Sequence, residues 1–155
     1  THTHEYPEDA WDDIIRVNLK GVWLCMKYEI QQMLRQGGGA VVNTSSAAGL
    51  VGHPWQTAYV ASKHGVNGLT KVAALENAKA GIRVNAVCPG IVRTPRIERY
   101  IADRPGWIEG FIAQEPVGRL GESEEIGDAV AWLCSDAASF VTGHLMQVDG
   151  GFVAQ

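Results

Sequence analysis

A tyrosine and a lysine four residues apart, Tyr59 and Lys63, form the pair in this chain whose spacing first suggests chemistry. Side chains at i and i+4 lie on the same face of a helix. A free tyrosine, with a pKa of about 10, is a poor base at neutral pH, but a neighbouring ammonium favours the phenolate. A phenol tuned in this way can exchange a proton with an alcohol. Taken alone, the spacing is more typical of a solvated helix face.

A serine lies where such a phenol would need a partner. Ser46 stands at the carboxyl end of a predicted buried strand, residues 40–46, upstream of Tyr59. In open α/β sheets, ligands bind at the carboxyl ends of the strands. A serine hydroxyl there can hydrogen-bond a substrate oxygen whose charge changes during a reaction. The alternative is that Ser45 and Ser46 are only the polar end of the strand.

Two further segments carry residues that could bind a ligand. Pro89 and Gly90 end the next predicted strand and would expose backbone groups, together with the Thr94 hydroxyl, to a planar amide ligand. An ordinary turn is the alternative. Asn18 lies inside the first predicted helix close to Gly21, and both residue types are poor in helix interiors. We expect a local kink or a polar contact there, unless Asn18 is simply solvated.

The elements that must position these residues alternate between helix and strand. Helices are predicted at residues 8–36, 57–80 and from a capping Ser123, strands at 40–46, 82–88 and 145–148, and a partly helical insert at 95–116. This alternation predicts an α/β fold with a parallel sheet. The glycines at 37–39 follow a helix and open a strand, so they are predicted to end a helix rather than to bind phosphate.

Composition restricts the class of protein. The chain of 155 residues is 46% hydrophobic and 19% charged, which is typical of one globular domain. Thirteen basic and 17 acidic residues give a formal charge of −4, which argues against nucleic acid or a membrane surface as a partner. We expect no membrane span, no signal peptide, no metal site at His2 and His4, and, from three scattered cysteines, a cytoplasmic location.

Five motifs together resemble the short-chain dehydrogenases/reductases. They are VNLKG at 17–21, NTSSAAG at 43–49, YVASK at 59–63, RVNAVCPGIVRT at 83–94 and VTGHLMQVDGG at 141–151. The resemblance runs over nearly the whole chain, in the order and spacing of the family. It implies a partial Rossmann-like, doubly wound parallel sheet that contains the last three strands with their flanking helices.

The resemblance also implies roles and a reaction. Tyr59 would be the general acid/base, Lys63 would support it and bind the nicotinamide ribose, and Ser46 would orient the substrate. Asn18 would hold a water in a proton relay. The wall beside the nicotinamide would be formed by Pro89, Gly90, Val92 and Thr94. The implied activity is NAD(P)-dependent interconversion of a secondary alcohol and a ketone, with NAD or NADP as cofactor and a small-molecule substrate.

The family's opening turn, TGxxxGxG, and its NNAG segment are not found in these 155 residues. We therefore expect the chain to be the C-terminal catalytic part of one Rossmann-type domain, with the choice between NAD and NADP decided elsewhere. The chain alone would then be inactive, and an inactive fragment or pseudoenzyme that acts as a binding or assembly module is the alternative function. Sugar-nucleotide epimerases, which share YxxxK, would need a further substrate domain.

The insert and the two long helices bear on substrate and assembly. Apolar residues of the 95–116 insert, among them Ile97, Tyr100, Trp107 and Phe111, would either form a lid over a substrate with an apolar body or cap the core. His53 and Trp55 would face the pocket or lie in an exposed loop. The two long helices resemble those that join subunits of the family, so we expect a homotetramer or homodimer for the full-length protein, although their apolar stripes could also pack internally.

Overall fold

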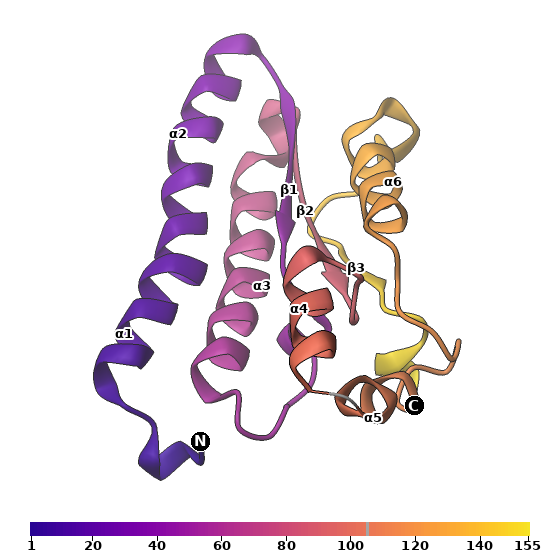
Figure 1. The fold of residues 1–155 in the computed structure, drawn as a ribbon. Coiled ribbons are helices and arrows are strands. Elements are labelled where there is room, and N and C mark those ends of the chain that lie inside the picture. The colour runs from indigo at the N-terminus through magenta and orange to yellow at the C-terminus, as the bar shows by residue number, and fades with distance from the viewer. Residues whose placement is uncertain (105) are drawn as a thin grey trace.

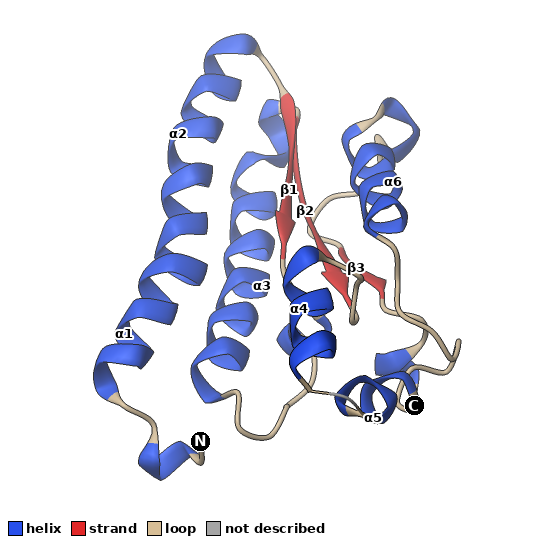
Figure 2. Cartoon of the chain, in the orientation of Figure 1, coloured by secondary structure: helices blue, strands red, loops and turns tan. Residues whose placement is uncertain are grey.

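A parallel sheet of three strands organises the computed structural model, which describes residues 1–104 and 106–155. Its strands are β1 (Gly39–Thr44), β2 (Ile82–Pro89) and β3 (Leu145–Val148), in the order β1-β2-β3. Gly39 lies opposite Ile82, and Ala86 lies opposite Leu145. All carboxyl ends therefore lie at one edge of the sheet (Figure 2). The predicted α/β class with three parallel strands is confirmed.

Helices cover both faces of this sheet. They are α1 (Glu8–Ile15), α2 (Gly21–Gln36), α3 (Thr57–Asn77), α4 (Pro95–Asp103), α5 (Trp107–Ile112) and α6 (Ser123–Cys134). Figure 1 shows α2 and α3 on one side of the strands and α6 on the other, while α4 and α5 lie near the carboxyl ends. Helices on both faces are the doubly wound arrangement that the sequence predicted.

The core lies between the sheet and helices α2 and α3. Ile82 and Val84 of β2 are fully buried and pack with Met26 of α2 and Ala73 and Ala74 of α3. A central parallel strand is covered on both faces, which explains why the β2 sequence is apolar rather than alternating. The small alanines let α3 lie close to the sheet, and α3 carries the Tyr59–Lys63 pair.

The predicted helix 8–36 contains a π-helical turn at Arg16–Lys20. Asn18 lies at its centre and donates from Nδ2 to Ser62 Oγ on α3 at 3.4 Å. The expected irregularity at Asn18 is thus confirmed, and a polar contact accompanies it. Single π-helical turns often occur at functional sites.

Several predicted boundaries need correction. The first strand ends at Thr44 rather than at Ser46, because the chain turns there into a 3₁₀ segment, Ala47–Gly49. Glu122, rather than Ser123, caps α6: its side chain forms a reciprocal capping box with Glu125. Ser123 instead donates from Oγ to Arg93 O at 3.0 Å. Sequence preference favours Ser over Glu as an N-cap, but here the hydrogen bond from Glu122 N to Glu125 Oε2 at 2.8 Å helps to place the helix start at Glu122.

Glycines end two helices as predicted. Gly37 closes α2 with φ 84°, and Gly81 follows α3 and a 3₁₀ turn, Ala78–Ala80, with φ 71°. Both are left-handed conformations that residues with a Cβ adopt at a cost.

Among the described helices, none is both long and apolar enough to cross a membrane.

Candidate active site

A cleft of about 1080 Å³ opens at the carboxyl ends of β1 and β2, beside α3 and α4. Seven of the residues predicted to act in a site line it: Ser46, Tyr59, Lys63, Pro89, Gly90, Val92 and Thr94. They come from three segments that are far apart in the sequence. Asn18 is the predicted site residue that does not line this cleft.

Ser46 is held in a defined orientation by the turn that follows β1. Its backbone is extended, and its Oγ accepts a hydrogen bond from Ala48 N at 3.1 Å, which caps the 3₁₀ segment. Because this bond uses an oxygen lone pair, the hydroxyl proton can still be donated to a ligand oxygen. The turn that ends β1 therefore also directs the Ser46 hydroxyl, a hydrogen-bond donor, toward the cleft.

Tyr59 and Lys63 lie in the first turns of α3. Lys63 Nζ donates to Thr44 O at 2.9 Å and lies 5.7 Å from the centroid of the Tyr59 ring. Burial lowers the pKa of Lys63 below its ordinary value, and a smaller charge effect of Cys88 opposes this shift. The ammonium is thus held between the end of β1 and the phenol ring.

Asn18 reaches the site through α3. Its amide donates to Ser62 Oγ, and Ser62, which is fully buried, donates in turn to Tyr59 O at 2.7 Å. Asn18 therefore contacts the helical turn that carries both Tyr59 and Lys63. The structure brings it to this turn but not to the surface of the cleft.

The segment after β2 forms a wall of the cleft. Ile91 O and Arg93 N bond with Gly121 at 2.9 and 2.8 Å. In such a parallel bridge, the N–H and C=O of the residue between them, Val92, point to the opposite side. Thr94 caps α4 through an Oγ1 that accepts from Ile97 N at 3.3 Å. The backbone N–H and C=O of Val92 and the hydroxyl of Thr94 can therefore hydrogen-bond a planar amide, such as the carboxamide of a nicotinamide.

Glu115 was not predicted, and it supports this wall. Its Oε1 accepts from Ile91 N at 3.1 Å, and its Oε2 is buried without a hydrogen-bond partner among the described residues. Burial raises the pKa of the Glu115 carboxyl, a backbone hydrogen bond from Ile91 opposes the shift, and Asp149 adds to it. No motif could reveal this role, since the contact joins the end of the insert to the end of β2.

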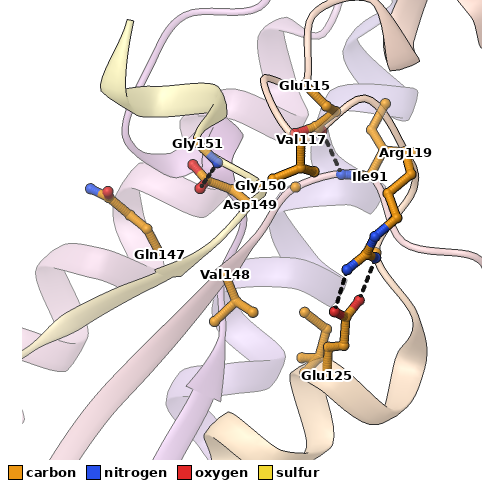
Figure 3. Close-up of a pocket in the computed structure, with 13 residues that line it drawn as sticks. Ile91, Glu115, Val117, Arg119, Glu125, Gln147, Val148, Asp149, Gly150 and Gly151 are labelled. Carbon is orange, nitrogen blue, oxygen red and sulfur yellow. Dashed lines mark hydrogen bonds and ion pairs between the residues drawn. The ribbon is translucent and has the colours of Figure 1, made fainter.

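Figure 3 shows Glu115 beside a second, smaller pocket of about 390 Å³ at the ends of β2 and β3. Asp149 accepts from Gly151 N there at 3.0 Å, and Arg119 pairs with Glu125 at 2.7 Å. Both interactions fix local turns. The pocket borders Gly90 and Ile91, which belong to the wall of the main cleft. Its residues therefore support that wall from the side that faces away from the cleft.

The insert divides between cleft and core. Ile97 and Tyr100 line the cleft, whereas Ile108 is buried and Phe111 stacks on His53 with centroids 6.2 Å apart. The two expectations for the insert therefore each hold for part of it. Of the loop residues, Trp55 lines the cleft and His53 does not. Pro105 and the Trp107 side chain lie outside the described residues.

Comparison with known proteins identifies the family. The protein-family model described as enoyl-(acyl carrier protein) reductase matches residues 1–153 of this chain. Cyclohexanol dehydrogenase of Acinetobacter sp. (strain SE19) is 46% identical over 153 residues, covering 99% of this chain and 59% of that protein. The 2,5-dichloro-2,5-cyclohexadiene-1,4-diol dehydrogenase of Sphingobium indicum is 50% identical over 139 residues, covering 89% and 56%.

A solved structure agrees with these sequence relatives. The structure described as ElxO with NADP bound superposes with a TM-score of 0.95 at 34% identity, covering 99% of this chain and 62% of that one. The chain belongs to the short-chain dehydrogenase/reductase family, as its motifs predicted. It spans about three fifths of the length of these relatives.

Proposed function

We propose that residues 1–155 form the catalytic part of an NAD(P)-dependent oxidoreductase that interconverts a secondary alcohol and a ketone. The observation that carries this proposal is the cleft lined by Ser46, Tyr59 and Lys63 at the carboxyl edge of a parallel sheet. In this proposal the chain is the C-terminal catalytic part of one Rossmann-type domain. The relatives named above support the proposal, since they are named as dehydrogenases of ring alcohols or diols.

Proton transfer falls to Tyr59 in this proposal. The Tyr59 hydroxyl gives a proton to the oxygen of a ketone, or takes one from an alcohol. Ser46 donates a hydrogen bond to the same oxygen and so fixes its position. The Lys63 ammonium, which is 5.7 Å from the Tyr59 ring, stabilises the phenolate by its charge.

A relay returns the proton to solvent. The proposed relay runs from Tyr59 through Lys63 to a water held near Asn18. What supports it is that Asn18 lies in a π-helical turn and contacts Ser62, which stands between Tyr59 and Lys63 on α3. An asparagine whose amide is already committed to Ser62 would hold such a water through its remaining polar groups.

The cofactor would lie along the segment after β2. Its nicotinamide would be held by the backbone of Val92 and the Thr94 hydroxyl, with Pro89 and Gly90 shaping the wall and Lys63 on the ribose. When bound, the nicotinamide supplies or accepts the hydride. In the family, the residues that select NAD or NADP lie in the nucleotide-binding half of the domain. ElxO, whose structure is described with NADP, supports this class of cofactor.

The proposed substrate is a small alcohol or ketone on a ring, and the proposed assembly is a homotetramer or homodimer. Apolar side chains remain exposed on the two long helices, with Trp23 and Tyr28 on α2 and Val72 and Leu75 on α3. Exposed apolar residues of this size on adjacent helices are typical of a subunit interface. Ala73 of α3, by contrast, packs in the core, so only part of the apolar stripe on α3 is available for a subunit interface.

Two substitutions test the proposed roles in the full-length protein, meaning the polypeptide as its gene encodes it. Tyr59→Phe should lower kcat by at least about 100-fold, the usual scale of general acid/base catalysis, and leave cofactor affinity nearly unchanged. Lys63→Met should impair both, because Lys63 serves the phenol and the ribose. Steady-state rates with cyclohexanol and fluorescence titration of the cofactor measure the two effects. A Tyr59→Phe enzyme with near-normal kcat would exclude the proposed role.

A further inference from the structure

Two arginines of the insert, Arg96 and Arg104, line the cleft near Tyr100. The guanidinium carbons of Arg96 and Arg104 lie 5.8 and 5.2 Å from the centroid of the Tyr100 ring. The spacing of four residues places Arg96 and Tyr100 on one face of α4, and Arg104 follows where that helix ends. Contact with an aromatic ring restricts a guanidinium, so both arginines are partly ordered before any ligand binds.

The charge of both arginines is uncompensated within the described part of the chain. No acid there lies within 4.0 Å of either guanidinium, and the nearby Glu98 and Glu122 pair with Arg93 instead. The remaining charged side chain among the described residues that line the cleft is Lys63, which is also basic. The cleft is therefore basic in a chain whose formal net charge is −4.

Such an arrangement selects for a particular ligand chemistry. Guanidinium groups bind carboxylates and phosphates through paired, charge-assisted hydrogen bonds. Ile97, on the same helix, contributes an apolar surface to the same cleft. A ligand that fits has an apolar body and an anionic group away from its reacting carbon.

We infer that Arg96 and Arg104 form an anion-binding subsite, and that the preferred substrate is a ring alcohol or ketone that carries a carboxylate. The inference rests on the proposed function, because it places the reacting oxygen at Tyr59 and Ser46 and the carboxylate toward α4. The pyrophosphate of the cofactor has similar chemistry and is the competing source of the anion.

A matched pair of substrates tests the inference in the full-length protein. Cyclohexanol and 4-hydroxycyclohexanecarboxylate share the ring and the reacting carbinol, and they differ in the carboxylate. The native enzyme should show a kcat/KM about tenfold or more higher for the carboxylate. Arg96→Met and Arg104→Met should each raise KM for the carboxylate about tenfold, the scale of one charge-assisted hydrogen bond. Their KM for cyclohexanol and their Kd for the cofactor should stay near native values.

Arg99→Met is the matched control, since Arg99 lies on the same helix but bonds to Pro95 O and does not line the cleft. It should leave both substrates unaffected. Added salt should reduce the preference for the carboxylate, because these side chains are exposed and screening weakens the attraction.

The outcomes separate this inference from the proposed function. If Arg96→Met and Arg104→Met weaken cofactor binding, or weaken both substrates equally, the arginines serve the cofactor or the fold and the inference is wrong. If the native enzyme oxidises neither alcohol, the proposed substrate class fails. Calorimetry with cyclohexanecarboxylate then decides the subsite: native binding that Arg104→Met weakens about tenfold supports it, and equal or absent binding refutes it.

Discussion

Gly49→Ala would place a methyl group between the loop after β1, which carries Ser46, and helix α3, which carries Tyr59 and Lys63. A Cβ at Gly49 would lie 2.7 Å from Ser45 Oγ, 2.8 Å from Asn67 Nδ2 and 3.0 Å from Lys63 O. Asn67 Nδ2 also donates to Gly49 O at 2.8 Å, so the loop after β1 is fastened to α3 at this point. The methyl group would force the loop and the helix apart.

The cost follows from these contacts. Overpacking costs about 1–3 kcal/mol, and loss of the Asn67 hydrogen bond adds about 1 kcal/mol. The free energy of unfolding should fall by about 2–4 kcal/mol, which lowers Tm by about 5–15 °C in a protein of this size. Because the loop carries Ser46 and the helix carries Tyr59, kcat should also fall, by up to about 100-fold for a shift near 1 Å.

Thermal denaturation and steady-state kinetics on the full-length protein measure both effects. The control is Gly68→Ala, the same change on an exposed position of α3 with no heavy atom within 4 Å of the new Cβ. It should stabilise the protein by up to about 1 kcal/mol, because alanine is the better helix former, and keep kcat. Native Tm and kcat in Gly49→Ala would refute the argument that close packing at Gly49 sets the geometry of the site.

Three further predictions concern charge and completeness. Burial raises the pKa of Glu115, so its ionised form destabilises the fold above the ordinary glutamate pKa; Glu115→Gln should be more stable than the native protein at pH 8, with the difference shrinking toward pH 4 in denaturant titrations. Burial lowers the pKa of Lys63, so the native protein should gain stability relative to Lys63→Met as pH rises from 7 toward 10, and a constant difference would contradict this. Residues 1–155 alone should bind NADH or NADPH weakly and self-associate through the open edge of β1, and tight saturable binding with turnover would overturn the expectation that the missing TGxxxGxG turn is required.

The sequence predicted those features that depend on local periodicity and on motifs. β3 was expected at 145–148 and lies at Leu145–Val148, and Gly37 and Gly81 end helices as expected. Apolar runs and terminal glycines identify such elements because one residue type decides the local backbone. The motifs also identified seven residues that line one cleft, since the carboxyl ends of parallel strands must meet at one edge.

Other features depend on contacts between distant segments and could not be predicted. Glu115 binds Ile91 N, a contact that no spacing rule relates to the strand it supports. Arg96 and Arg104 were part of an insert expected to be apolar, and their orientation into the cleft depends on how α4 packs. A polar contact of Asn18 was expected, but its partner, Ser62 on α3, lies 44 residues away and could not be named, and the role of Asn18 in holding a water stays a prediction.

The central claim is that Ser46 and Tyr59 act on one substrate oxygen, and a crystal structure of the full-length protein with its oxidised cofactor and a ring alcohol tests it most directly. The substrate oxygen should lie within about 2.6–3.2 Å of both Tyr59 Oη and Ser46 Oγ, with the carbinol carbon facing the nicotinamide beside Val92. An alcohol bound elsewhere in the cleft, or a Tyr59 hydroxyl directed to bulk solvent, would contradict the account.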